Sequence, residues 1–205
     1  MTEMSVKEGQ AEEALEARRS EKDLEESYNR LSSAAQCLLL CLAPFREMFF
    51  VNLEQNYFSW LQEQPALASL VIDQQTLEEV RSFGLFVPDK SIRRFLRLQP
   101  LHQAFLRERL REAAELREAI ETAFFGLYID FCAELYRLLT SQNEKEKRLG
   151  VLLTQYELEN LRGAVEMALR TQASMTGLYA VLSTYVGLVQ ESGVEVVEPE
   201  QAVAC

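Results

Sequence analysis

Apolar residues recur at every third or fourth position along most of the chain, which is the spacing of one face of an α-helix. The pattern begins with Leu24, Tyr28 and Leu31. Ser32 comes next, and serine is a preferred helix N-cap, so we expect a helix to start there and to end before Pro44. The spacing therefore predicts two consecutive helices at the start of the patterned region.

Two more short helices are expected before the spacing changes. One covers about residues 52–62, and the next begins near Asp73, a second capping residue type, and ends at Gly84. Two short apolar runs, over 85–87 and 95–98 with a Pro-Asp-Lys turn between them, then predict the strands of a β-hairpin. The three helices from Ser32 onward, followed by a two-stranded hairpin, have the layout of a winged helix.

Helical spacing returns after the hairpin and continues almost to the end of the chain. A proline at position 100, well placed for a first helical turn, opens the next expected helix. The spacing predicts helices over about residues 101–110 and 116–138, a break at 140–143, one continuous helix over about 149–169, and a last helix over about 178–189.

The expected fold class is therefore mainly α. A winged-helix domain of three helices and a short β-hairpin occupies residues 23–111, and an antiparallel helical bundle or hairpin segment, similar to the start of a TPR array, occupies 112–192. We expect residues 1–22 to be an acidic, partly disordered segment and residues 193–205 to be a disordered acidic tail. The 8 Gly and 5 Pro among 205 residues agree with few turns and long helices.

Composition excludes several classes of protein. No apolar run approaches the roughly 18 to 20 residues that cross a bilayer, and the acidic N-terminus does not resemble a secretory signal, so we expect a cytoplasmic protein without a membrane partner. The four cysteines form no CxxC motif and only one histidine is present, which favours reduced thiols over a metal site. A net charge of −11 disfavours general binding to nucleic acid.

Three segments carry a resemblance to a known family. SYNRLSSAAQCLLLCLAPF (27–45) resembles the opening of the winged-helix domain in signal-transduction NTPases of the NB-ARC class, also called STAND, and FLRLQPLHQAFLRERL (95–110) resembles the strand and helix that close it. LTQYELENLRGAVEMALRTQ (153–172) resembles the helix that begins the repeat region after the winged helix. Bacterial, especially cyanobacterial, members look similar in this order.

The family's P-loop, GxxxxGK[ST], is missing from this sequence. The resemblance therefore implies the downstream half of such an NTPase without its P-loop domain, with no catalytic residues and no cofactor. In relatives a Met-His-Asp motif contacts bound ADP, and the matching position here is 98–100, where Gln99 is the remaining hydrogen-bond donor for a nucleotide. The implied function is to transmit or restrain conformational change through a protein partner, such as a nucleotide-binding domain on another chain.

Basic residues mark the expected contact with that partner. Residues 88–111 hold seven basic side chains against two acidic ones, in a chain that is acidic elsewhere. The residues proposed to bind the partner are Lys90, Arg93, Arg94, Arg97 and Arg107.

Two alternatives remain open. Winged helices also bind DNA, but the third helix, which would enter the groove, carries Asp73, Glu78 and Glu79 against Arg81 alone, so DNA is not the favoured partner. The other alternative is a free-standing helical adaptor. Neither reading includes a small-molecule substrate.

Four other side chains belong either to the fold or to a functional site. His102 is expected to be structural rather than catalytic, and Glu157 is expected to lie on a solvated face. Asn160 is expected to be part-buried and to fix the register of a helix pair. Trp60 belongs either to the core or to a docking patch.

Overall fold

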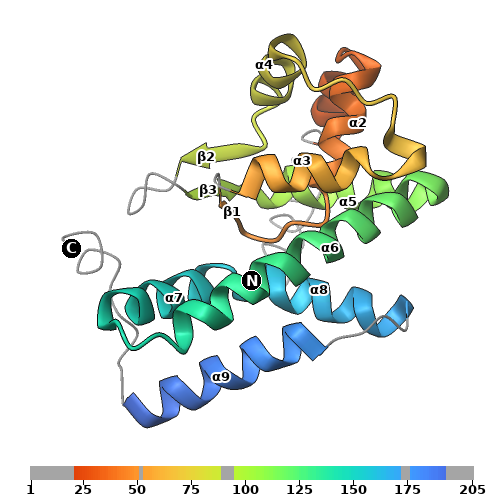
Figure 1. Cartoon of the computed structure of the whole chain (residues 1–205). Coiled ribbons are helices and arrows are strands. Elements are labelled where there is room, and N and C mark those ends of the chain that lie inside the picture. The colour runs from red at the N-terminus through yellow and green to blue at the C-terminus, as the bar shows by residue number, and fades with distance from the viewer. Residues whose placement is uncertain (1–20, 51–52, 89–94, 172–175, 193–205) are drawn as a thin grey trace, which may run out of the picture.

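A computed structural model describes residues 21–50, 53–88, 95–171 and 176–192, and its fold is mainly helical with a small three-stranded sheet (Figure 1). The first part of the chain contains a helix over 21–29, α2 (Ser33–Leu42), β1 (Met48–Phe50), α3 (Glu54–Gln62), the 3-10 turn η2 (Pro65–Leu67), α4 (Gln74–Ser82), β2 (Phe86–Pro88), β3 (Phe95–Leu98) and α5 (Pro100–Glu112). The second part contains α6 (Ala114–Leu139), α7 (Glu144–Tyr156), α8 (Leu158–Thr171) and α9 (Thr176–Ser192).

The ends of the early helices follow from local side-chain chemistry. The Ser32 hydroxyl accepts a hydrogen bond from a backbone N–H in the first turn of α2, and the Asp73 carboxylate does the same for α4, which confirms both predicted caps. Pro100 occupies the first turn of α5. Gly84, just beyond α4, has a φ of 77°, a left-handed conformation that glycine adopts without strain and that turns the chain into β2.

The sheet contains one strand that the sequence pattern did not predict. The expected hairpin is present as β2 and β3, which pair antiparallel, but β3 also pairs antiparallel with β1 on its other side, so the strand order is β1-β3-β2. Phe50 of β1 lies opposite Phe95 of β3, with the two rings stacked at 4.9 Å between centroids. A strand of three residues is too short to show alternation, and its partner lies far away in sequence.

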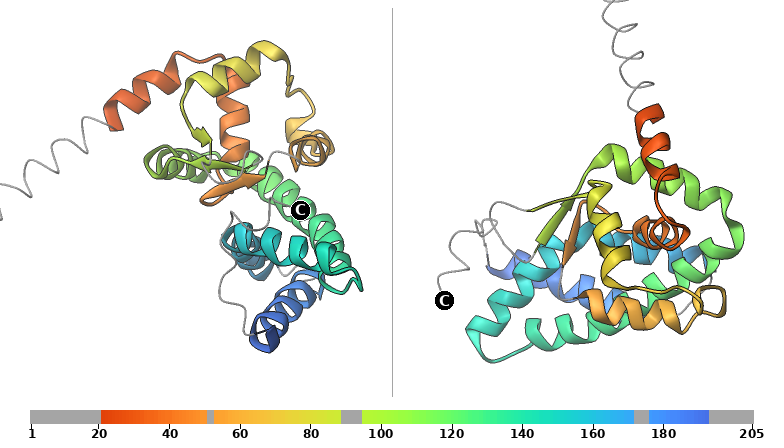
Figure 2. Two further views of the ribbon diagram at one scale, coloured as in Figure 1. Left: turned by 90° about the vertical axis from the view of Figure 1, so that its left-hand side faces the viewer. Right: turned by 90° about the horizontal axis from the view of Figure 1, so that it is seen from above.

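Helix α6 is the common support of the molecule, because α3 and η2 pack on it from one part of the chain and α7, α8 and α9 from the other (Figures 1 and 2). A single core runs through both parts. Phe45, in the loop between α2 and β1, lies at its centre, with edge-to-face contacts to Phe49, Tyr57 and Phe124 at 4.8 to 5.0 Å. The α2–β1 loop is therefore anchored against α6 rather than free to move.

Gly126 allows α3 and α6 to approach closely. A Cβ at this position would lie 2.6 Å from the ring of Trp60, so only glycine leaves room for the indole. The Trp60 Nε1–H donates to the carboxylate of Asp130 at 2.9 Å. Trp60, which the sequence left between core and docking patch, is part-buried and serves this helix–helix contact.

The single helix expected over about 149–169 is wrong, because the chain forms two helices that meet at Glu157. Residue 157 ends α7 with its carboxyl group turned inward, where it accepts hydrogen bonds from Tyr128 and Asn160. Both α7 and α8 pack on α6. Each helix therefore keeps an apolar face toward α6. The apolar spacing continues across the break, so it does not reveal that one helix ends and another begins.

Several expectations fall on parts of the chain that lie outside the described residues. These are residues 1–20 of the acidic N-terminal segment, the tail over 193–205, and the tip of the hairpin over 89–94. Within the described ranges, no helix combines the length and the apolarity that a membrane crossing requires. Cys41 and Cys132 are buried as free thiols, as expected of cysteines that act as small apolar residues.

Candidate functional site

The residues proposed from the sequence to bind a partner do not form one surface in the structure. Lys90, Arg93 and Arg94 lie outside the described residues. Arg97 is exposed on β3. Arg107 projects from α5 toward the α2–β1 loop, where it contributes to a cleft described below.

Gln99 has a structural contact rather than an open donor. Its side-chain amide donates to the carbonyl oxygen of Gly84 at 2.8 Å, and its backbone N–H donates to that of Leu85 at 2.9 Å. These bonds tie the start of α5 to the turn after α4. A contact between Gln99 and a nucleotide stays a prediction, and it would require the side chain to leave Gly84.

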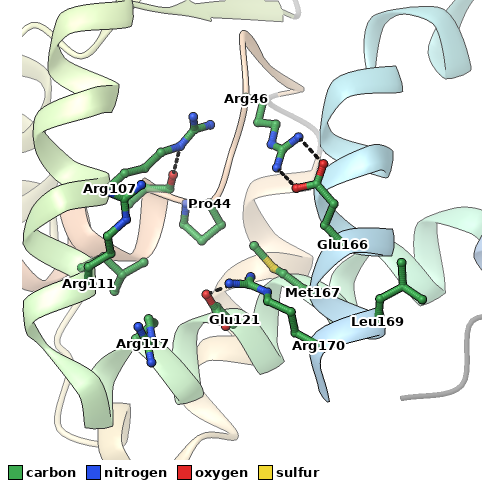
Figure 3. A pocket seen from close by; sticks show the side chains of 12 residues that line it. Pro44, Arg46, Arg107, Arg111, Arg117, Glu121, Glu166, Met167, Leu169 and Arg170 are labelled. Carbon is green, nitrogen blue, oxygen red and sulfur yellow. Dashed lines mark hydrogen bonds and ion pairs between the residues drawn. The ribbon is translucent and has the colours of Figure 1, made fainter. Parts of the chain in front are cut away.

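A charged cleft of about 630 Å³ opens between the two parts of the chain (Figure 3). We call it the arginine cleft. Its walls come from the α2–β1 loop, α5, the start of α6 and the C-terminal half of α8. The charged residues that line it are Arg46, Arg107, Arg111, Arg117, Glu121, Glu166 and Arg170. Five arginines against two glutamates make it strongly basic in an acidic protein.

One side of the arginine cleft is neutralised by its own carboxylates. Arg46 forms a two-pronged ion pair with Glu166, and Arg170 bonds Glu121 at 3.2 Å (Figure 3). The hydrogen bond from Arg46 is the main reason why the pKa of Glu166 lies below its ordinary value. Gly163 leaves room for this approach, because a Cβ there would lie 3.1 Å from Arg46 Nε and the arginine side chain would have to shift slightly.

The other side of the cleft, formed by Arg107, Arg111 and Arg117, has no acidic partner among the residues that line it (Figure 3). We call these three residues the tri-arginine side. Arg111 pairs with Glu108, an exposed residue of the same helix that does not line the cleft. Arg117 forms no ion pair with any side chain in the described part of the chain. Positive charge is thus in excess on this side.

Arg107 is the anchored member of the tri-arginine side. Its Nε and Nη2 groups donate to the backbone carbonyl oxygens of Ala43 and Phe45 at 3.3 and 3.1 Å, which hold the guanidinium in place. Burial lowers the pKa of Arg107 below its ordinary value, and the nearby positive charges of Arg46 and Arg111 lower it further. A bound anion would remove this repulsion.

A second polar region lies close by, and it is closed to solvent. Tyr128, Glu157 and Asn160, which we call the buried polar cluster, are each 0% exposed. The Tyr128 hydroxyl donates to Glu157 Oε2 at 2.5 Å, and the Asn160 amide donates to the same oxygen at 2.6 Å. Burial raises the pKa of Glu157 to about 7, although both hydrogen bonds oppose the rise. The expectation of a solvated Glu157 is therefore wrong.

Asn160 joins the two parts of the chain. Its side-chain oxygen accepts from the backbone N–H of Arg46, and its amide also donates to the carbonyl oxygen of Met48 at 2.9 Å. It is fully buried rather than part-buried, and it binds the turn before β1 instead of fixing a helix pair. The sequence did contain a signal that Glu157 is buried, because this residue lies four positions from both Leu153 and Leu161, on the same apolar stripe.

His102 packs its ring edge-to-face on Phe83, with centroids 5.1 Å apart, and burial lowers its pKa below the ordinary value. Its Nδ1 atom is buried without a hydrogen-bond partner among the described residues. No group of three or more His, Cys, Asp or Glu side chains is arranged to hold a metal ion within the part of the chain that the structure describes. The contacts of His102 are those of a residue packed into the fold.

Comparison of the chain with protein-family models, with curated proteins and with solved structures finds no match. The chemistry of the arginine cleft is therefore the main guide to function. Planar guanidinium groups bind carboxylate and phosphate groups through paired hydrogen bonds. Pro44, Leu110 and Met167 add apolar surface between the arginines. The cleft is thus suited to an anionic ligand that also carries apolar groups.

Proposed function

We propose that the chain is a non-catalytic regulatory module that binds an acidic segment of a partner protein in the arginine cleft. The observation that carries the proposal is the origin of the five arginines. Arg46, Arg107 and Arg111 belong to the first part of the chain, whereas Arg117 and Arg170 belong to the second. A segment bound between them contacts both parts at once. Because one core already joins the two parts, they offer the segment a fixed surface, and its binding or release can pass a conformational change to the partner.

A winged-helix assignment for residues 23–111 supports the same proposal. The order α2–β1–α3–α4–β2–β3, with β1 paired to β3, fits that fold and extends the hairpin expected from the sequence. In NTPases of the NB-ARC class, which the sequence resembles, the winged helix packs on a nucleotide domain in the off state and swings away in the on state. A nucleotide-binding domain on another chain is therefore our preferred partner, with signalling as the setting.

DNA is a weaker candidate for the partner. Helix α4, which would enter the major groove of a winged-helix complex, carries the exposed Glu78 and the part-exposed Glu79 against Arg81. Carboxylates there repel the phosphate backbone. A titration of duplex DNA at low salt separates the two partners, since a winged-helix DNA reader binds there and an acidic-segment reader does not.

The proposal is tested with a fluorescent glutamate-rich peptide and a matched peptide in which glutamine replaces each glutamate. Fluorescence anisotropy should show binding of the glutamate peptide only, and the affinity should fall as salt is added. A double variant, Arg111→Glu with Arg117→Glu, should weaken binding by about a hundredfold, since two attractions become repulsions.

Arg81→Glu with Arg148→Glu provides the matched control. Both residues are exposed, lie on α4 and α7, and do not line the arginine cleft, yet the pair changes the net charge by the same amount. The control should keep the wild-type affinity. Equal loss in both double variants, or no binding by the wild type, overturns the proposal.

A further inference from the structure

The two sides of the arginine cleft differ in how many of their arginines are paired with a carboxylate. Arg46 and Arg170 already have carboxylate partners, whereas the tri-arginine side has none within the cleft. A ligand that only matched one carboxylate to one arginine would leave most of that positive charge without a partner. The tri-arginine side therefore calls for a group with more than one negative charge.

We propose that the tri-arginine side is a subsite for a phosphoryl group, carried on a serine or threonine of the acidic partner segment. This inference rests on the proposed function, because it names the modification that the arginine cleft recognises. A phosphoserine or phosphothreonine carries a charge of about −1.5 to −2 at neutral pH and three strong acceptor oxygens. Arg107, Arg111 and Arg117 supply donors to match them.

The donors that remain available support this assignment. Arg107 uses Nε and Nη2 for the carbonyl groups of the α2–β1 loop and keeps Nη1 for a ligand. Arg111 uses Nη1 for Glu108, an exposed contact that contributes little. Arg117 forms no ion pair with any of the described residues, so its guanidinium is not committed to them. One anchored arginine and two adjustable ones can surround a tetrahedral group without first breaking an ion pair inside the cleft.

The repulsion within the tri-arginine side also favours a dianion over a single carboxylate. Burial is the main reason why the pKa of Arg107 is lowered, and the charges of Arg46 and Arg111 lower it further against the opposing effect of Glu166. Binding a group with two negative charges relieves this repulsion more fully, because the gain grows with ligand charge. Leu110 and Pro44 border the same wall and offer apolar contact to the carbon atoms that carry the phosphate.

The test compares three peptides that differ at one position, which is serine, phosphoserine or glutamate within the same acidic sequence. The wild-type chain should bind the phosphoserine peptide about tenfold or more tightly than the other two. Arg117→Gln should remove most of this preference and should leave the fold intact, because Arg117 makes no ion pair with described residues. Arg148→Gln, on the exposed surface of α7, should keep the preference.

Two measurements, the pH dependence of binding and phosphorus-31 NMR, separate recognition of a phosphoryl group from a general charge effect. The preference should fall as the pH drops below about 6, where the phosphoryl group takes up its second proton, whereas binding of the glutamate peptide should change little there. Phosphorus-31 NMR should show that this second pKa is lowered when the peptide binds the wild type, and less so with Arg117→Gln.

The outcomes distinguish this inference from the proposed function. Equal affinity for all three peptides overturns the phosphoryl subsite and leaves the acidic-segment proposal in place. No binding of any peptide overturns both. The inference is also overturned if inorganic phosphate displaces the phosphopeptide when the two are present at equal concentration. The site would then recognise a free anion and not a modified segment.

Discussion

The arginine cleft and the buried polar cluster lie on two sides of one turn. The polar groups of the cluster are buried and hydrogen-bonded, whereas several charged groups of the cleft are open to solvent and lack acidic partners within it. The backbone of Arg46 is bound by Asn160 inside the protein, while its side chain reaches Glu166 in the open cleft. In the buried polar cluster, hydrogen bonds link side chains that are all 0% exposed. In the cleft, three arginines lack acidic partners among the lining residues.

This difference separates residues that stabilise the fold from residues that are available to bind. A buried polar group that loses its partner costs stability, because no water replaces the lost hydrogen bond. An exposed arginine costs almost nothing when it has no partner, since water solvates it. Mutations in the buried polar cluster should therefore change the free energy of unfolding, whereas mutations of Arg111 and Arg117 should change binding and leave stability almost unchanged. Arg107 is the exception on the tri-arginine side, because its hydrogen bonds to the α2–β1 loop also stabilise the fold.

Asn160→Ala should have the largest effect on stability. It leaves the Arg46 N–H, the Met48 carbonyl oxygen and Glu157 each short of one partner, and we expect a loss of about 3 to 4 kcal/mol. Urea unfolding followed by circular dichroism measures it. Asn56→Ala, on the exposed face of α3, is the control and should change stability by less than about 0.5 kcal/mol. Similar values for the two variants would contradict the role given to Asn160.

Glu157→Gln should change how stability depends on pH. The pKa of Glu157 is about 7 in the folded chain, raised by burial from an ordinary value of 4.5. Below pH 4.5 both states hold the proton and the stabilisation is complete. Between pH 4.5 and 7 only the folded state keeps the proton, so stability falls as the pH rises, by about 3 kcal/mol in all, and then levels off.

The glutamine variant cannot ionise and should lack this part of the decline. Unfolding free energies measured at a series of pH values, as the difference between variant and wild type, isolate the effect from other titrating groups. Glu159→Gln, a part-exposed neighbour on α8, is the control and should run parallel to the wild type. If Glu157→Gln also runs parallel, Glu157 does not hold a proton at neutral pH.

Glu47→Gly should stabilise the chain by about 1 kcal/mol or less. Glu47 is the one residue other than glycine with a positive φ, 52°, in the described part of the chain, and it occupies the turn bracketed by Asn160. Glycine adopts this conformation without steric strain, although its flexibility in the unfolded chain offsets some of the gain. Glu47→Ala removes the same charge but keeps the strain, so its thermal unfolding temperature should not rise. The comparison of the two variants therefore separates the effect of strain from that of charge.

Arg117→Ala should have the smallest effect on stability, below about 0.5 kcal/mol, because the side chain has no ion pair to lose among the described residues. The same variant should weaken binding of an acidic peptide. Differential scanning calorimetry and the anisotropy titration measure the two effects on one preparation. A large loss of stability here would end the distinction between the two regions.

The sequence by itself determined most of the helical architecture. Caps at Ser32 and Asp73, the proline at position 100 and the apolar stripe of α6 depend on residues within one or two turns, so a local pattern reveals them. The β2–β3 hairpin has a local signal of the same kind. The basic character of α5 was also visible, and it led to Arg107 as one residue of the cleft.

Only the tertiary structure decided what those residues face. Strand β1 forms because it pairs with β3, which lies more than forty positions away in the sequence. The helix is interrupted at Glu157 because Tyr128 and Asn160 donate hydrogen bonds to its buried carboxyl group. The arginine cleft gathers side chains from four elements between Arg46 and Arg170. Hydrogen bonds and charge contacts between distant segments depend on how the helices pack on α6, and no local spacing of residues encodes that arrangement.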